Sequence, residues 1–300
     1  NGEGDIMKTG TTSYTRKLTL AGVFFVLPVL LYFLILYWYP LISAFVMSFQ
    51  ETIPGLKMQF AGLKTYREVF ADEDFWRSLA NTLLFTVQAV SVDVLLALVI
   101  AIALYNVRSD AFRNVLTLFY VLPTLVSLAA AGFIWEWLFH PRFGLTNQLF
   151  ALVGLPTLKF LQDENQVITS LAVINVWVRV GFSVLILLAG LQSIPDTYFD
   201  AAKVDGARGL KLYWHVMLPL LLPHLGAVTL LEVIFSVKIF DVVYVTTQGG
   251  PAGASDMLML YLYNNAFRFY RIDKAAVTAV FIFAVLLVFG ILQRRFLAGR

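Results

Sequence analysis

The feature that most constrains this chain is a series of long apolar stretches, each able to cross a lipid bilayer. A bilayer-spanning helix needs about 20 mostly apolar residues. Charged residues make up only 14% of the chain, against about 25% in a soluble domain. We therefore expect an all-α integral membrane protein with about six transmembrane helices. The predicted spans lie near residues 19–40, 79–105, 115–138, 168–190, 217–245 and 276–293.

The chain shows no boundary of a soluble domain and no repeat of fixed period. We expect an N-terminal tail over residues 1–18 and one transmembrane domain over residues 19–300. Basic residues near span ends mark the cytoplasmic side, and they gather in the short segments 108–113, 203–211 and 294–300. The loops on the other side are longer and carry more acidic residues. This pattern predicts that both termini are cytoplasmic.

A polar segment at about 192–216 separates the fourth and fifth predicted spans. Small alanines favour a helix, and a glycine permits a tight bend before the apolar pattern resumes. The segment therefore reads as a helix, a glycine turn and a second helix. Its central residues are Asp200, Ala201, Ala202, Asp205, Gly206 and Ala207.

These residues resemble the cytoplasmic EAA loop in the membrane subunits of ATP-binding-cassette importers, above all the maltose-transporter-like, binding-protein-dependent sugar permeases. The usual acid in that loop is Glu, and Asp200 is one methylene shorter. The resemblance implies a coupling helix that docks into an ATPase subunit, with Asp200, Ala201, Ala202, Asp205, Gly206 and Ala207 as the coupling residues. An amphipathic linker on the membrane surface is the alternative. A motif of this kind depends on its structural context, which here is the Leu-Pro-Leu-Leu entry into the next span at residues 218–221.

The same resemblance implies a transport subunit rather than an enzyme. In such an assembly a second, similar permease and two ATP-binding-cassette ATPase subunits surround the path. A periplasmic or extracellular solute-binding protein delivers a carbohydrate from outside. The chain would lie in a bacterial-type cytoplasmic (inner) membrane, among lipids and without nucleic acid. ATP and Mg would be bound by the partner subunits, with no cofactor in this chain.

The sequence lacks the residues that other kinds of site require. It has no cysteine, which removes disulfides and Cys-ligated metals. His140, His215 and His224 are too scattered to indicate a metal site. The Gly249-Gly250 turn is not followed by the Lys and Ser/Thr of a phosphate-binding loop, so we expect no catalytic, metal or nucleotide site here.

Charged residues inside the predicted spans are functional candidates, because each costs about 2.5–3.5 kcal/mol on insertion. They are Asp93, Arg179, Glu232, Lys238 and Asp241. Lys238 and Asp241 are three residues apart and can pair on one helical face. Glu232 is turned away from Lys238, so its expected partner is Arg179 on the fourth span.

One stripe of the fourth span combines amide, cationic and aromatic groups, which suits the hydroxyls and apolar faces of a sugar. By resemblance to the maltose-transporter permease, residues of the third, fourth and fifth spans line the solute path, and Lys238 is added as a candidate from its charge. Arg179 and Glu232 depart from that pattern, which has small residues at both places. The predicted path is Thr124, Leu128, Asn175, Val178, Arg179, Phe182, Glu232, Ser236 and Lys238.

Two interpretations of the solute stay open. Arg179, with Lys238, can bind an anionic solute such as an alginate-like uronate oligosaccharide, because a guanidinium matches a carboxylate. Alternatively, Arg179 and Glu232 neutralise each other and the solute is a neutral oligosaccharide. A rival of a different class is a gradient-driven secondary carrier that uses Asp93, Glu232 and Asp241 as a proton relay. The glycine turn and polar stripe favour the sugar-contacting member of a heterodimer.

Overall fold

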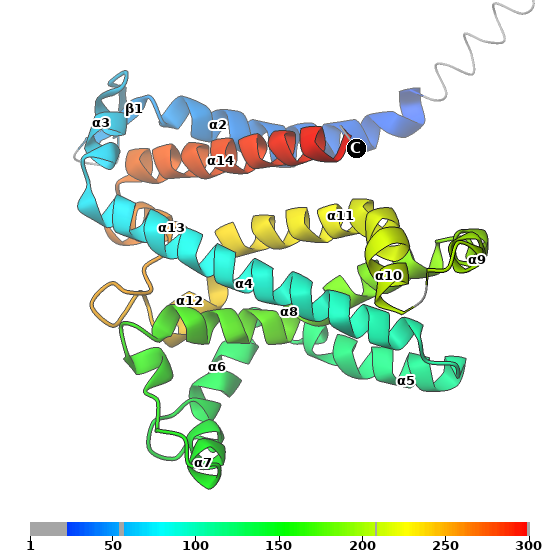
Figure 1. Ribbon diagram of the computed structural model, residues 1–300. Helices are drawn as coiled ribbons and strands as arrows, with labels where there is room; N and C mark the ends of the chain where they lie inside the picture. The colour runs from blue at the N-terminus through cyan, green and yellow to red at the C-terminus, as the bar shows by residue number, and fades with distance from the viewer. Residues whose placement is uncertain (1–22, 54–56, 208, 299–300) are drawn as a thin grey trace, which may run out of the picture.

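The computed structural model describes residues 23–53, 57–207 and 209–298 (Figure 1). Within these residues, five helices are long and apolar enough to cross a membrane, and a bent pair of helices brings the number to six. The predicted all-α membrane fold is confirmed. The predicted tail at 1–18 lies outside the described residues. The five single spans are Val23–Met47, Glu73–Tyr105, Val167–Gln192, Tyr213–Thr246 and Ile272–Leu297.

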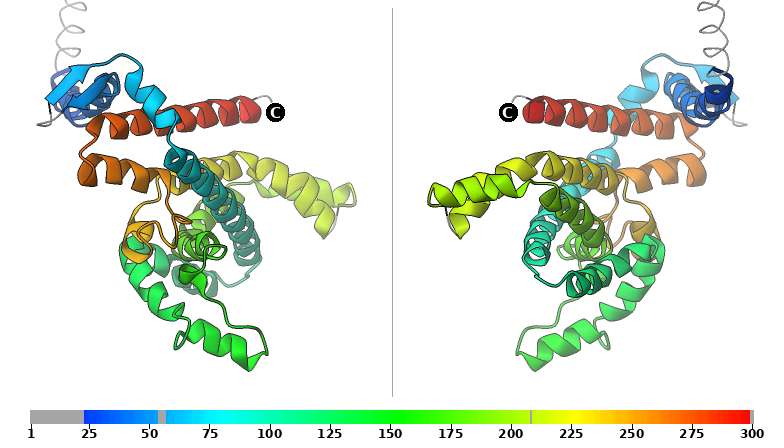
Figure 2. Two further views of the ribbon diagram at one scale, coloured as in Figure 1. Left: turned by 90° about the vertical axis from the view of Figure 1, so that its left-hand side faces the viewer. Right: turned by 90° about the vertical axis from the view of Figure 1, so that its right-hand side faces the viewer.

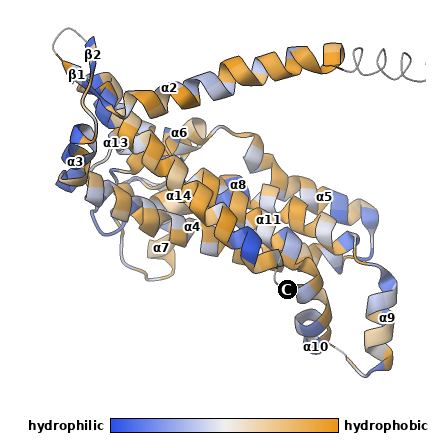
Figure 3. Ribbon diagram, turned by 90° about the horizontal axis from the view of Figure 1, so that it is seen from above, coloured by the Kyte–Doolittle hydropathy of each residue, from blue (hydrophilic) through white to orange (hydrophobic). Residues whose placement is uncertain are grey.

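The first span diverges from the rest of the bundle toward its N-terminal end (Figures 2 and 3). It contains a π-helical turn, η1, and ends in helix α2, which packs against α14. A two-stranded antiparallel hairpin follows, with Gln50 opposite Phe60. The elements of this part are η1 (Leu34–Trp38), α2 (Tyr39–Met47), β1 (Gln50–Ile53), β2 (Lys57–Phe60) and α3 (Lys64–Phe70).

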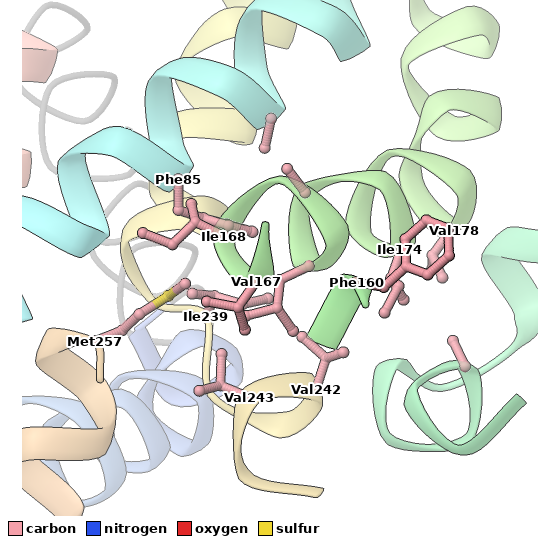
Figure 4. Packing of buried hydrophobic residues seen from close by; sticks show 14 of the residues in the cluster. Phe85, Phe160, Val167, Ile168, Ile174, Val178, Ile239, Val242, Val243 and Met257 are labelled. Carbon is pink, nitrogen blue, oxygen red and sulfur yellow. The ribbon is translucent and has the colours of Figure 1, made fainter. Parts of the chain in front are cut away.

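Two helices form the centre of the molecule, α4 (Glu73–Tyr105) and α8 (Val167–Gln192). They make the most extensive helix pairing in the structure, and α8 is the most buried of the spans. The side chains of Phe85, Ile174 and Val242 are fully buried in a cluster that joins these helices to α12 (Figure 4). Burial on several sides explains why α8 is apolar around most of its circumference.

The third span is bent by 97° between Leu125 and Leu128, so the span expected at 115–138 consists of two helices. Pro123 lacks a backbone N–H and disturbs the helix there. Val126 is extended, and the Ser127 hydroxyl accepts from the Ala130 N–H at 3.3 Å, which caps a new helix. The elements are α5 (Asp110–Val121), η2 (Leu122–Leu125) and α6 (Leu128–Leu138).

Close helix packing in this region requires a small residue on α8. A Cβ on Gly181 would overlap the carbonyl oxygen of Tyr120, at the end of α5. Beyond the bend, α6 leads to α7 (Leu145–Leu152) and η3 (Phe160–Gln162). Figure 2 shows α6 and α7 projecting from the side of the bundle opposite α14.

The fifth span begins in a π-helical turn and is interrupted near its far end. Helix α11 ends at Val237, and Lys238–Phe240 connect it to α12. Lys238 and Asp241 therefore do not share one helical face, and among the described residues no ion pair joins them. The pairing that their spacing allows is therefore not present. The elements are α9 (Asp196–Val204), α10 (Leu210–Leu212), η4 (Tyr213–Met217), α11 (Leu218–Val237) and α12 (Asp241–Thr246).

The chain ends with a short helix, a π-helical turn and the last span, namely α13 (Leu258–Tyr263), η5 (Asn264–Arg268) and α14 (Ile272–Ala298). The connection before α13 is anchored on α4. Asn81 Nδ2 donates to the carbonyls of Gly253 and Asp256 at 3.1 and 2.9 Å, and the Leu258 N–H donates to Thr82 Oγ1 at 2.9 Å. Figure 3 shows that the spans are mainly hydrophobic, whereas α3 is hydrophilic.

Candidate solute path and coupling segment

Arg179 of α8 and Glu232 of α11 form an ion pair between two spans. Arg179 Nε donates to both Glu232 oxygens, at 3.1 Å to Oε1 and 2.9 Å to Oε2. The exposed fraction of the side chain is 15% for Arg179 and 1% for Glu232. The pairing expected between these residues is present, and it gives each of the two charges within the spans an opposite partner.

The Arg179 guanidinium also lies over the ring of Phe235, with Cζ 3.6 Å from the ring centroid. Phe235 is three residues after Glu232 on α11, so both side chains lie on one helical face. A cation over an aromatic face adds about 0.5–2 kcal/mol. Arg179 is thereby held by two groups of the same helix.

A second carboxylate lies close to this pair. Asp93 of α4 is fully buried, and the Ser183 hydroxyl of α8 donates to its Oδ2 at 2.6 Å. Asp93 is near enough to Glu232 and Arg179 to interact with both charges. We call Asp93, Arg179, Ser183, Glu232 and Phe235 the charged cluster. It joins α4, α8 and α11, and it holds two acidic groups for one base.

Two predicted path residues are buried beside this cluster without a hydrogen-bond partner. Asn175 is 1% exposed and Ser236 is fully buried. Among the described residues, none bonds to the amide nitrogen or oxygen of Asn175, or to the hydroxyl of Ser236. A buried polar group left unsatisfied costs about 1–3 kcal/mol. Such groups in a functional protein call for a bound solute, water or partner residue.

The remaining predicted path residues occupy varied environments. Thr124 Oγ1 donates to the Val178 carbonyl at 2.9 Å and thus fixes the bend of the third span against α8. The Val178 side chain is buried, Leu128 is half-buried, and Phe182 is 36% exposed. Lys238 is exposed at the end of α11. The structure brings Arg179 and Glu232 together, whereas Phe182 and Lys238 lie outside the charged cluster.

Three members of the charged cluster were absent from the expected path. Asp93 was expected as a charged residue within a span, and Ser183 and Phe235 were not expected at all. Ser183 lies four residues after Arg179 on α8, and Phe235 lies three residues after Glu232 on α11. Helical spacing could have placed each beside its charged neighbour. Neither Ser183 nor Phe235 carries a charge, so neither stands out within an apolar span.

The predicted coupling segment is exposed at one end of the bundle. Helix α9 ends in a glycine turn, where Gly206 has φ +84° and the Ala207 N–H donates to the Ala202 carbonyl at 2.8 Å, a pattern that commonly ends helices. Phe199 is buried and lies 6.3 Å from the Tyr105 ring of α4, measured between centroids. The helix is therefore anchored on the bundle.

The outward side of α9 is left open. Asp200, Ala201 and Asp205 are exposed, and Val204 is 87% exposed. Figure 1 shows α9 and α10 at the end of the molecule where α14 finishes, whereas the hairpin and α3 lie at the opposite end. The segment is therefore accessible to another subunit.

Solved structures share this fold. A bacterial ABC transporter described as importing the acidic polysaccharide alginate has a chain that matches 96% of this chain over 98% of its own length. The TM-score is 0.83 and the sequence identity is 21%. A likeness of this kind concerns the arrangement of the helices.

Sequence comparisons identify relatives over most of the chain. The trehalose/maltose transport system permease protein of Thermococcus litoralis is 31% identical over 81% of this chain and 82% of its own length. The arabinooligosaccharides transport system permease protein of Bacillus subtilis is 30% identical over 93% of this chain and 88% of its own. The family model for the binding-protein-dependent transport system inner membrane component matches residues 93–300. These matches confirm the resemblance based on the polar segment, and the chain belongs to this family of multi-pass inner-membrane permeases.

Proposed function

We propose that this chain is one permease subunit of an ATP-driven importer and forms part of the path for an oligosaccharide. The observation that carries the proposal is the pair of unpartnered polar side chains, Asn175 and Ser236, buried beside the Arg179–Glu232 ion pair. An amide and a hydroxyl offer both donors and acceptors, as sugar hydroxyls require. Relatives named for trehalose, maltose and arabinooligosaccharides support this solute class.

The assembly proposed from family membership contains a second permease, two ATPase subunits and a solute-binding protein. The ATPase subunits bind ATP and Mg. Helix α9 docks on one of them and transmits its closure to the spans, because α9 is both exposed outward and anchored inward through Phe199. In this proposal the end of the molecule that carries α9 is cytoplasmic.

The ion pair favours a neutral solute over an acidic one. Both oxygens of Glu232 already engage Arg179 Nε, so the guanidinium has its counter-charge within the protein. Of the described basic residues on the predicted path, Lys238 alone is exposed. An acidic oligosaccharide would depend on that residue rather than on Arg179.

The rival carrier mechanism has little support in the geometry. Its relay needs Asp93, Glu232 and Asp241 in succession across the membrane. Asp93 and Glu232 belong to the charged cluster, but Asp241 is exposed at the start of α12, beyond the end of α11. Family membership also points to a separate ATPase as the energy source.

Site-directed crosslinking tests the proposed coupling. The chain contains no cysteine, so Val204→Cys places a single thiol on the exposed side of α9. With a short bifunctional crosslinker in membranes, we expect a covalent product with an ATPase subunit. Leu152→Cys on α7 is the matched control, since Leu152 is 81% exposed and Val204 87%. A complex that shows no ATPase product from Val204→Cys, or an equal yield from both variants, would contradict the proposal.

A further inference from the structure

Four aromatic side chains gather at the far end of the fifth span, where three rings contact one another and the fourth contacts Tyr263. The Phe240 ring is stacked on Tyr244 at 5.1 Å and lies 5.0 Å from Tyr263, measured between centroids. Tyr263 lies 5.0 Å from Phe267, and Tyr244 and Tyr263 meet edge to face at 5.2 Å. We call Phe240, Tyr244, Tyr263 and Phe267 the aromatic ladder. Its members come from the segment after α11, from α12, from α13 and from η5.

The ladder has a fixed base and an open side. Phe240, Tyr244 and Tyr263 pack against the buried cluster around Ile239 and Val243 and remain half-buried. Phe267 is 64% exposed. Side chains that are already held by packing lose little rotamer freedom on binding, which lowers the entropic cost of an interaction.

The ladder continues directly from the proposed solute path. Ser236 is on the last turn of α11, and Phe240 follows four residues later, after Lys238. Lys238 and Asp241 are exposed next to it in sequence, and Arg268 is exposed at the end of η5, directly after Phe267. The apolar ring faces are thus accompanied by groups that can bond to hydroxyls or carboxylates.

We propose that the aromatic ladder is a binding surface for successive sugar rings of an oligosaccharide, at the outer end of the path. The inference rests on the proposed function and extends it. Sugars expose apolar C–H faces that pack on aromatic rings, while their hydroxyls reach polar neighbours. In this proposal one end of the solute lies at Ser236, and a longer chain extends past Phe240 onto the ladder. The ladder therefore selects for chain length.

Aromatic residues also gather where a span meets the membrane surface, and this use of the rings makes a different prediction. Anchoring in the interface would affect all solutes alike. A binding surface changes the response to long chains alone. Chain length is therefore the variable that separates the two roles.

The experiment measures uptake by the complete complex in proteoliposomes with its solute-binding protein. The probes are malto-, arabino- and mannuronate oligosaccharides, from disaccharide to heptasaccharide. For Phe267→Ala we expect the half-saturating concentration of the heptasaccharide to rise about fivefold, as the loss of one aromatic contact implies. The disaccharide should change less than about twofold. Tyr263→Ala should act in the same direction.

Phe269→Ala is the matched control, because Phe269 is 65% exposed and its ring is outside the ladder. It should leave every chain length unchanged. If Phe267→Ala and Tyr263→Ala transport all lengths as the wild type does, or weaken all lengths equally, the ladder has no binding role while the proposed function stands. If the wild-type complex transports none of the three series, the proposed function fails and this inference fails with it.

Discussion

The ion pair between Arg179 and Glu232 yields a prediction whose size follows from the geometry. Glu232 is 1% exposed, and both of its oxygens face Arg179 Nε. Replacing it by alanine leaves a buried guanidinium without its counter-charge. Breaking a buried pair in this way typically costs about 3–5 kcal/mol, because the remaining charge stays desolvated.

Two neighbours reduce that cost. The Phe235 ring lies 3.6 Å below the guanidinium and keeps its attraction to the cation. Asp93 remains as a second carboxylate within electrostatic reach. We therefore expect the lower end, about 3 kcal/mol. For a chain of this size that loss lowers the thermal midpoint by roughly 6–12 °C.

The assay is thermal unfolding of the purified complex in detergent, followed by fluorescence. Glu232→Gln is the matched control, because it keeps the shape and an acceptor oxygen and should lose less stability than Glu232→Ala. The double variant Arg179→Met with Glu232→Leu removes both charges and should recover most of the loss, since paired apolar replacements are often neutral. A midpoint for Glu232→Ala within about 2 °C of the wild type would refute the reasoning.

Two further predictions concern the solute and pH. In the reconstituted complex, Arg179→Ala should alter the ATPase stimulation by neutral and by acidic oligosaccharides to the same extent. Arg142→Ala, in an exposed loop, serves as the control. If Arg179→Ala lost only the response to acidic oligosaccharides, the anionic interpretation would be restored. Burial raises the pKa of Asp256 to about 6, and Arg77 partly opposes this shift. The folded state therefore binds the Asp256 proton more tightly than the unfolded state does. As a result, the free energy of unfolding falls as the pH rises from about 4 to 6. Asp256→Asn should therefore raise the thermal midpoint at pH 7 and have no such effect near pH 4, and an equal effect at both would contradict this assignment.

Hydropathy was sufficient to predict the spans because each must satisfy its backbone within a helix of bilayer length. It could not predict the bend of the third span, because an average over many residues does not register one proline. Pro123 removes one donor, and Ser127 then caps a new helix. The break after Val237 was missed for a similar reason, and it separates Lys238 from Asp241.

The ion pair within the charged cluster was predictable from the sequence, because Glu232 had only one candidate partner of opposite charge on a neighbouring span. Glu232 faced away from Lys238 on a helix, which left Arg179, and the structure contains that pair. The sequence did not distinguish a solute-binding arginine from a neutralised one. That distinction depends on a contact between residues far apart in the chain, and on the packing of α8 against α11.

The charged cluster joins three spans, α4, α8 and α11, through polar contacts. An unpaired charge would cost about 2.5–3.5 kcal/mol in any of these helices, so the pair stabilises the contact of α8 and α11 and penalises their separation. Asn175 and Ser236 lie beside this fixed contact and remain unsatisfied. We infer that the ion pair sets the spacing of the two helices, whereas the neutral polar groups recognise the solute. Rigid spacing and solute recognition would then be separable by mutation, with stability following Glu232 and transport following Asn175 and Ser236.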